Sequence, residues 1–421
     1  MNTFKGKKLL ILAGASVHCK VVEAAKEMGV YTIVTDYLES SPAKEIADEK
    51  WMLNITDVDG IVERCKAEGV DGVLNFCIDP GQRPYQAICE KLGLPCYGNA
   101  KQFHILTDKK AFKDFCVKNN VDIIPTYTLT DVENDDVEYP LLVKPVDSRG
   151  SRGISVCYNK EEVLEGTKIA SAESSNGEFV IEKYMGGKQD FTMTYLVVDG
   201  KPNLERICDR HLGKVEDGLD RQCVFSISPS KYSDMYIKNV HPRVVDFIKN
   251  LGIKNGPVFM QGFVDGDTVR FYDPGLRFPG SDYERLFYRA TGVNIVKMLV
   301  EFALTGKITD KFGNPEDGYL LAGKTCSQIV AAARAGKIGK YEGMEEISRN
   351  DNVVIADQRY FVGETVPPSG DVKQRIAEIV ILTNGREKAK ELVDWVYDTL
   401  DVRDENDEYM IVSKVDTDIL I

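Results

Sequence analysis

Residue patterns typical of a metal centre or a disulfide framework are missing from this 421-residue sequence. Its ten cysteines form no C-x-x-C pair, and its four histidines show no metal-ligand spacing. Several cysteines stand in apolar surroundings, as Cys77 does within residues 73–78. We therefore expect reduced, buried thiols in a cytoplasmic protein, and no zinc site.

Long hydrophobic runs and an excess of basic charge are missing as well. The apolar run at residues 9–13 is too short for a signal peptide or a membrane span. The formal net charge is −13, whereas binding to nucleic acid phosphates needs a basic face. The sequence therefore predicts a soluble protein whose partners are small molecules, with neither nucleic acid nor membrane among them.

The first hundred residues alternate strands and helices. Apolar strands are expected over residues 9–13, 31–35 and 72–76, and the helices between them end at glycines. Continuous apolar strands predict a parallel sheet that is buried on both faces. Asp36 stands where a dinucleotide fold places its ribose-binding acid, but residues 14–19 lack two of the glycines that such a site needs. A structural domain is favoured over NAD binding.

Residues 139–158 hold the pattern that says most about function. An apolar run, residues 140–143, ends on Lys144, and a loop of glycine, serine and arginine separates it from a second β-rich run at residues 154–158. A lysine supplies a mobile charge, and glycine lets backbone N–H groups close over an anion, so the pattern suits a polyphosphate. A β-hairpin with a flexible basic turn is the alternative.

Two further segments carry groups that suit a nucleotide. Glu182 ends a predicted strand, an irregular Met-Gly-Gly connection follows it, and Asp190 comes eight residues later. An adenine ring needs an apolar slot with backbone donors and acceptors, and a ribose needs one carboxylate. Lys109 lies in the first turn of a helix that Asp108 caps, where a lysine gains nothing from the helix dipole. A charged edge strand and a solvated surface lysine are the structural alternatives.

A hairpin is also predicted over residues 258–272, with its turn at Asp265-Gly266-Asp267. If its turn has three residues, 266–268, residue 265 lies opposite 269 and Gln261 lies opposite Asp273. Cross-strand Cβ atoms are about 5 Å apart, a separation at which two oxygen ligands suit Mg²⁺. Arg277 follows among two prolines and two glycines, and we expect this rigid loop to present it to an anion.

In this order the motifs resemble the ATP-grasp superfamily, and within it the carboxylate–amine ligases related to biotin carboxylase and the carbamoyl-phosphate synthetase large subunit. The resemblance implies an α/β fold with a Rossmann-like pre-ATP-grasp domain at residues 1–100. An ATP-grasp domain at residues 101–310, with its lid at about 125–190, and a C-terminal α+β region at residues 311–421 would follow. Related proteins are commonly dimers, so a homodimer is possible.

The resemblance also implies roles for individual residues. Lys109 and Lys144 would bind the ATP phosphates, and Arg277 would contact the reacting carboxylate or its phosphate, with Lys144 and Arg277 as the catalytic pair. The nucleotide lid would consist of Ser148, Arg149, Gly150, Ser151, Arg152 and Gly153. The adenine would contact Glu182, Lys183, Tyr184 and Met185, and the ribose Asp190. Gln261 and Asp273 would hold Mg²⁺ or Mn²⁺.

The metal motif departs from the family pattern E-x-N-P-R. Here it reads D-P-G-L-R, so aspartate replaces glutamate and Gly275 removes the asparagine side chain. Gln261 also stands where glutamate is commoner. The second Mg²⁺ would therefore depend more on phosphate oxygens and water, and we expect a lower metal affinity.

The remaining chain gives fewer signals. Arg210, His211, Lys214 and Arg221 place basic groups between two strands, which suits an anionic acceptor substrate, although a solvated basic loop is the alternative. We expect a helix over residues 326–335. Residues 307–421 show no pattern that is typical of a site.

The sequence thus predicts an ATP-dependent ligase that activates a substrate carboxylate as an acyl phosphate for attack by an amine, with release of ADP. The nearest alternative is an enzyme that activates bicarbonate. A nucleotide-binding protein without catalysis is the alternative from another class, and a dinucleotide oxidoreductase is more distant.

Overall fold

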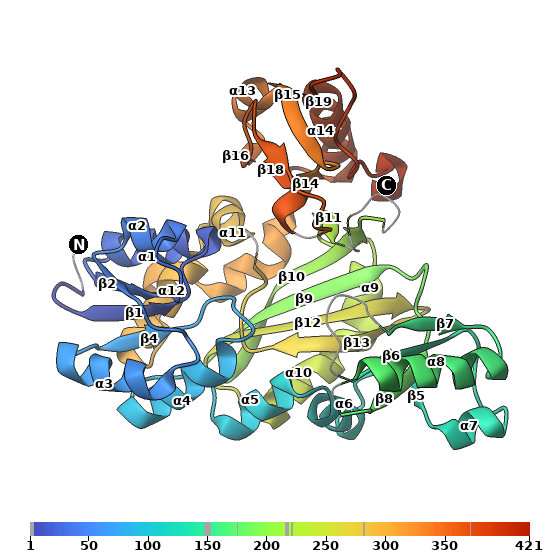
Figure 1. Ribbon diagram of the computed structural model, residues 1–421. Coiled ribbons are helices and arrows are strands. Elements are labelled where there is room, and N and C mark those ends of the chain that lie inside the picture. The colour runs from blue at the N-terminus through green and yellow to red at the C-terminus, as the bar shows by residue number, and fades with distance from the viewer. Residues whose placement is uncertain are drawn as a thin grey trace.

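A computed structural model describes residues 4–146, 153–174, 176–214, 219, 222–280, 283–370 and 372–421. Within these ranges the strands form four sheets with helices packed around them (Figure 1). One sheet is parallel and the other three are antiparallel. The predicted α/β class is therefore confirmed. Among the described residues, no helix combines the length and apolarity that a membrane span requires.

The parallel sheet lies at the N-terminus and has the strand order β3-β2-β1-β4. Its strands are β1 (Lys8–Leu12), β2 (Tyr31–Thr35), β3 (Glu49–Trp51) and β4 (Gly72–Leu74). The helical elements beside it are η1 (Ser16–His18), α1 (Cys19–Glu27), α2 (Pro42–Ile46), α3 (Val58–Glu68) and α4 (Gln82–Leu92). The Asp36 carboxylate accepts hydrogen bonds from the N–H groups of Gly14 and Leu38, both at 2.9 Å. Its oxygens therefore shape the strand end instead of presenting a free ribose ligand.

A small antiparallel sheet, in the order β5-β8-β6-β7, carries the predicted phosphate loop. Its strands are β5 (Thr126–Tyr127), β6 (Leu141–Pro145), β7 (Ser155–Cys157) and β8 (Phe179–Lys183). Helices α7 (Leu129–Glu133) and α8 (Lys160–Glu173) pack with this sheet, whereas α5 (Ala100–Thr107) and α6 (Lys109–Lys118), which precede it in the chain, contact β13 (Thr268–Gly275) of the largest sheet. This sheet has its own apolar core, formed with α7 and α8, and it projects from the rest of the molecule in Figure 1.

The largest sheet has eight strands in the order β13-β12-β9-β10-β11-β14-β18-β16. They are β9 (Asp190–Val198), β10 (Lys201–Leu212), β11 (Cys223–Ser228), β12 (Gly256–Asp265), β13 (Thr268–Gly275), β14 (Thr325–Ala332), β16 (Val353–Gln358) and β18 (Arg375–Thr383). The helix predicted at residues 326–335 is wrong, because β14 pairs with β11 and β18 along this segment. The sheet also continues past residue 310, so the predicted domain boundary there divides its strands.

The other elements cover this sheet or form the C-terminal lobe. They are α9 (Ser233–Met235), η3 (Tyr236–Val240), α10 (His241–Leu251), α11 (Tyr283–Thr291), α12 (Ile295–Thr305), η4 (Asp310–Phe312), η5 (Pro315–Gly323), α13 (Met344–Ser348), η6 (Val372–Gln374), α14 (Arg386–Thr399) and η7 (Thr417–Leu420). The lobe also holds β15 (Gly336–Glu342), β17 (Thr365–Val366) and β19 (Asp401–Asp404), paired in the order β17-β15-β19.

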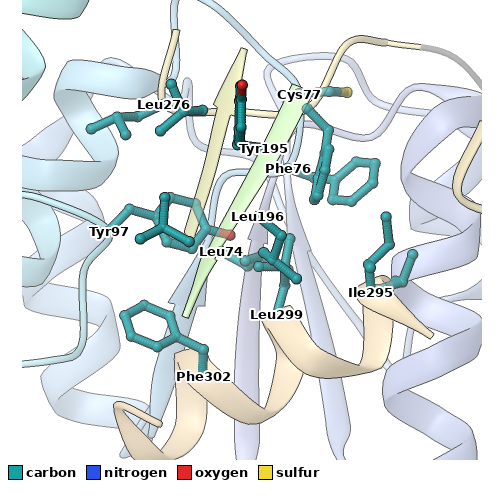
Figure 2. Packing of buried hydrophobic residues seen from close by; sticks show 14 of the residues in the cluster. Leu74, Phe76, Cys77, Tyr97, Tyr195, Leu196, Leu276, Ile295, Leu299 and Phe302 are labelled. Atoms are coloured by element: carbon teal, nitrogen blue, oxygen red, sulfur yellow. The ribbon is translucent and has the colours of Figure 1, made fainter. Parts of the chain in front are cut away.

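One apolar cluster joins the N-terminal sheet to the eight-stranded sheet. Figure 2 shows Leu299 and Phe302 of α12 beside Leu74 of β4 and Leu196 of β9. A buried ion pair lies at the same junction: the Lys20 ammonium on α1 is 2.6 Å from the Glu284 carboxylate on α11. Lys20 is 4% exposed and Glu284 is 2% exposed. Apolar packing and this buried charge pair are thus among the contacts that dock the N-terminal unit on the rest of the molecule.

The β12–β13 hairpin confirms one predicted pairing and corrects the turn behind it. Asp265 pairs with Thr268, so the connection has two residues and not three. The register then shifts between Gln261 and Gly262, and Gln261 lies opposite Asp273 as predicted. The extra residue of this bulge is Tyr272, and it offsets the shorter turn.

The junction between the two units gives a stability prediction. We expect Lys20→Met to lower the free energy of unfolding by about 3 kcal/mol, because it removes the ammonium that is 2.6 Å from the buried Glu284 carboxylate. Thermal unfolding measures the loss as a lower Tm. Lys50→Met is the control, since Lys50 and Glu45 form an exposed pair that is worth less than about 1 kcal/mol. Equal losses in the two variants would contradict a structural role for the buried pair.

Candidate active site

The predicted metal ligands lie at one edge of the eight-stranded sheet. Gln261 on β12 faces Asp273 on β13, and the Gln261 amide is 3.5 Å from the Thr192 hydroxyl on β9. Among the described residues, no donor forms a hydrogen bond or an ion pair with the half-buried Asp273 carboxylate. An open carboxylate beside an amide oxygen fits a divalent cation that takes its other ligands from phosphates and water.

Positive charge surrounds this carboxylate. Burial raises the pKa of Asp273, while the charges of Arg277 and Lys109 oppose that rise. Lys109 begins α6, its side chain is exposed, and Asp108 caps the helix by accepting a hydrogen bond from the Ala111 N–H at 2.9 Å. The described part of the chain holds no cluster of three or more His, Cys, Asp or Glu side chains that would enclose a metal by itself. A cation bound by Gln261 and Asp273 would therefore need further ligands from outside these side chains, such as phosphate oxygens or water.

Arg277 is held by a residue of the N-terminal unit. Its guanidinium donates to both oxygens of Asp79, through Nε and through Nη2, the latter at 2.9 Å. Nη1 donates to the Phe278 carbonyl oxygen at 2.9 Å, and the group lies 4.7 Å above the Phe259 ring. Arg277 itself is 7% exposed. The guanidinium is thus held in one position, and its contact with a substrate anion stays a prediction. Asp79 is an orienting partner that the sequence does not reveal.

Lys144 forms part of a buried triad with a second lysine. Glu182 on β8 accepts hydrogen bonds from Lys144 on β6 and from Lys113 on α6. Glu182 is only 4% exposed. Burial raises the pKa of its carboxyl, but the charges of Lys144 and Lys113 outweigh that effect and hold the pKa below its ordinary value. Glu182 thus fixes Lys144. The sequence analysis missed Lys113, although its i+4 spacing from Lys109 gave a signal.

The predicted adenine segment leaves β8 and approaches two proline carbonyls. The Lys183 N–H donates to Pro125 and the Tyr184 N–H donates to Pro140, both at 2.9 Å. Met185 is buried. The Glu182 side chain contacts the two lysines, so any adenine contact from this residue would come from its backbone. Residues 148–152 of the predicted lid lie outside the described residues, whereas Gly153 is described and has a φ of +71°.

Asp190, the predicted ribose ligand, already has protein partners. It accepts a hydrogen bond from Arg210 at 2.9 Å and another from the Tyr272 hydroxyl at 3.3 Å. Burial raises the pKa of Asp190, and the Arg210 charge opposes the rise. Asp190 therefore orients Arg210, whatever contact it makes with a nucleotide.

A cavity of about 220 Å³ opens on the same face of the large sheet. Gln261, one residue of the predicted metal pair (Gln261 and Asp273), lines it together with a group of arginines. The polar side chains that line it include Thr192, Arg206, Arg210, Gln261, Arg277 and Arg375. Arg375 lies in the C-terminal segment, which showed no pattern of a site. A larger, more open hollow of about 470 Å³, bordered by Lys324 and Arg386, contains none of the predicted site residues.

The predicted basic segment divides between the two faces of the sheet. Arg210 lines the cavity, whereas the neighbouring His211 packs against the Phe225 ring with centroids 5.7 Å apart. Burial lowers the pKa of His211, and the nearby Asp209 charge opposes that effect. Lys214 does not line the cavity, and Arg221 lies outside the described residues. Among the described residues of this segment, Arg210 is thus the basic side chain that lines the cavity.

Residues 108–310 match the family model for the carbamoyl-phosphate synthase L chain, ATP binding domain. This part of the chain is an ATP-grasp domain. The match begins at the cap of α6 and ends just after α12. It therefore includes the predicted phosphate ligands Lys109 and Lys144, the predicted metal pair and Arg277. The resemblance inferred from the motifs is therefore confirmed.

Individual relatives cover most of the chain. A formate-dependent phosphoribosylglycinamide formyltransferase of Sulfurisphaera tokodaii is 26% identical over 415 residues, which cover 92% of this chain and 95% of that protein. The structure of phosphoribosylglycinamide synthetase from Anaerococcus prevotii has a TM-score of 0.78 at 19% identity, covering 95% of this chain and 100% of that one. The structure of L-amino acid ligase from Bacillus licheniformis has a TM-score of 0.76 at 19% identity, and the match covers 96% of this chain and 100% of that one. These two structures share the fold of this chain.

The buried triad gives a pH-dependent prediction. We expect Glu182→Gln to destabilise the protein by about 3 kcal/mol at neutral pH, because two lysines then face each other without their carboxylate. The pKa of Glu182 is depressed in the folded state, so its contribution is complete above its ordinary value of 4.5 and is lost as the pH falls through the folded pKa. Urea unfolding of both proteins between pH 3 and pH 8 measures the difference.

The matched control is Glu138→Gln, which removes the partner of Lys183 at the surface. Its effect should stay below about 1 kcal/mol and shrink with added salt. A Glu182 variant whose stability matches that of the Glu138 variant at neutral pH would contradict the role assigned to the triad.

Proposed function

We propose that this protein is an ATP-dependent ligase that activates a substrate carboxylate as an acyl phosphate, which an amine then attacks. The observation that carries the proposal is the placement of Gln261, Asp273 and Arg277 on one hairpin and its following loop, with Gln261 and Arg277 in the lining of an arginine-rich cavity. The ATP-grasp match and the fold shared with an amino acid ligase support it.

The nucleotide would lie between the small sheet and the large one. Lys144 and Lys109 would bind its phosphates, and the loop 148–153 would cover them. Residues 182–185 would contact the adenine and Asp190 the ribose. Glu182 has the additional role of holding Lys144 at the end of β6, where its ammonium is fixed before a nucleotide arrives.

Gln261 and Asp273 would hold Mg²⁺, or Mn²⁺ in its place. The open carboxylate of Asp273 and the adjacent amide oxygen fit such an ion, which would supply neutralisation of phosphate charge when bound. The protein contributes only one negative charge to this pair. We therefore expect the metal requirement to be met largely by the phosphates.

Arg277 would orient the reacting carboxylate. An oxygen of that carboxylate attacks the γ-phosphorus in line, the bond to ADP breaks, and an acyl phosphate remains. The amine nitrogen then attacks the acyl carbon and phosphate leaves. Asp79 and Phe259 hold the Arg277 guanidinium from two sides, so the anion contact needs no reorganisation during the reaction.

The cellular context follows from charge and cysteine chemistry. The ten cysteines of the sequence are all unpaired thiols in the structure, and most are buried. We place the protein in the cytoplasm, with small-molecule substrates, no nucleic acid partner and a homodimer as the possible assembly. The net charge of −13 supports the absence of nucleic acid.

ADP release tests the proposal. Mg·ATP is combined with pools of amines, small carboxylic acids and bicarbonate, each alone and in pairs. We expect ADP only when an acid and an amine are both present, and Lys144→Ala should reduce its release more than 100-fold, because the phosphates lose a fixed charge. ADP formed with bicarbonate alone would favour a bicarbonate-activating enzyme. Bound ATP without ADP under any condition would favour a non-catalytic nucleotide-binding protein.

Lys110→Ala is the matched control for the lysine variant. Lys110 is next to Lys109 on α6, but it forms an exposed i,i+4 pair with Asp114. Turnover of this variant should stay within about twofold of the wild type. An equal loss in both variants would contradict the assignment of Lys144.

The neutral ligand at position 261 gives a separate prediction. Gln261→Glu restores a second negative charge beside Asp273, so the Mg²⁺ concentration for half-maximal ADP release should fall severalfold. Asp273→Asn should raise it about tenfold, since the protein then offers no anionic ligand. A Mg²⁺ requirement that neither substitution changes would place the metal elsewhere.

A further inference from the structure

The cavity beside the metal pair has a floor made of polar side chains from neighbouring strands. Gln261 on β12 pairs with Thr192 on β9, and Ser226 on β11 pairs both with Arg210 on β10 and with Gln328 on β14. Residues two apart on a strand share a face, so Arg206 projects on the same side as Arg210. The floor thus runs from the metal pair across five strands.

Arg206 is a buried cation at the centre of this floor. It is 4% exposed, and its Nη2 donates to the Ser226 hydroxyl at 3.2 Å and to the Cys208 sulfur at 3.3 Å. Its guanidinium lies 4.3 Å from the centroid of the Tyr283 ring. The Nε atom has no hydrogen-bond partner, and no described carboxylate forms an ion pair with the group. An uncompensated guanidinium at this depth is costly unless an anion binds to it.

Arg375 on β18 is a second arginine of the cavity that has no ion-pair partner among the described residues. Its Nε donates to the Gln222 side-chain oxygen at 3.1 Å, and the described residues offer it no ion pair. Burial lowers the pKa of Arg375, and the like charges of Arg359 and Arg210 lower it further. Glu378 lies near, but its carboxylate accepts hydrogen bonds from Arg359 and Gln328. Arg375 therefore keeps donors available to the cavity.

The four arginines of the cavity divide into two pairs. Arg277 and Arg210 have carboxylate partners, Asp79 and Asp190. Arg206 and Arg375 have none among the described residues. Strands β12 and β10 are two spacings apart, roughly 10 Å, so an arginine on β10 reaches a group several bonds away from one held beside Gln261.

We propose that the cavity binds a substrate with two anionic ends: one group at Arg277, and a second carboxylate or a phosphate at Arg375, on the β18 side of the cavity. This inference rests on the proposed ligase function, and it names the substrate class. Formate and bicarbonate each carry a single anionic group, so neither would engage both Arg277 and Arg375. The substrate is a dicarboxylic or phosphorylated small molecule.

Calorimetric titration of the full-length protein without nucleotide tests the proposal at low ionic strength. The carboxylate arm compares succinate, glutarate and citrate with pentanoate. The phosphate arm compares 3-phosphoglycerate with glycerate. We expect at least one multiply charged compound to bind tenfold or more tightly than its singly charged counterpart, and the arm in which it appears identifies the distal group. Equal affinities throughout both arms would overturn the proposal.

Arg375→Gln is the decisive variant because Arg375 is less buried than Arg206. Its affinity for the preferred compound should fall about 30-fold, since truncating one partner of a buried charge pair typically has at least this effect. Arg375→Lys should recover part of the affinity by restoring the charge. Arg349→Gln is the control: it removes a surface arginine that pairs only with Glu345 in an i,i+4 ion pair and should change nothing. An unchanged affinity in Arg375→Gln would overturn the assignment.

The two proposals fail in different ways. Anion binding that depends on Arg375, without ADP release from any substrate pair, would support the assignment of the cavity and contradict the ligase function. ADP release from acid and amine pools, without preference for multiply charged compounds, would support the ligase function and contradict the assignment of the cavity. A folded Arg375 variant is verified by its Tm before either conclusion is drawn.

Discussion

Successive side chains of a strand point to opposite faces of a sheet, and the candidate site depends on this alternation. On β10, Arg206 and Arg210 face the cavity, while Ile207 between them belongs to the apolar core. A slip of one residue in any of these strands would move charged groups into that core. The hydrophobic packing that docks the N-terminal unit therefore also fixes which side chains the cavity receives.

The sequence predicts local chemistry well where a strong turn signal anchors it. The Asp265-Gly266-Asp267 turn located the hairpin, and the opposition of Gln261 and Asp273 is confirmed although the turn was predicted one residue too long. Two errors cancelled there, because nothing in the sequence marks the bulge at Tyr272. The strand β14 was predicted as a helix because its alanines favour helices, but pairing on both edges overrides that propensity.

Three residues of the candidate site, Asp79, Lys113 and Arg375, could not be predicted from the sequence, for a different reason. Asp79 lies 198 residues from Arg277, and Lys113 lies 69 residues from Glu182. Such partners meet only when separate sheets dock, so no spacing along the chain records the contact. Arg375 illustrates the same limit: in sequence it is an ordinary residue at the start of an apolar strand, and only the order of strands in the sheet brings it to the cavity.

The neutral Gln261 in the metal motif and the arginines of the cavity both favour the binding of an anionic substrate. A glutamate at position 261 would place a second negative charge in the lining of the cavity, where it would repel a bound anionic group. Two unit charges about 5 Å apart repel by about 3 kcal/mol at an effective dielectric constant of 20. Gln261 removes this repulsion and reduces the hold on the metal at the same time. This exchange favours an anionic group bound beside Gln261 and Arg277, whatever charge the rest of the substrate carries, so the departure from the family pattern is consistent with an anionic substrate in this cavity.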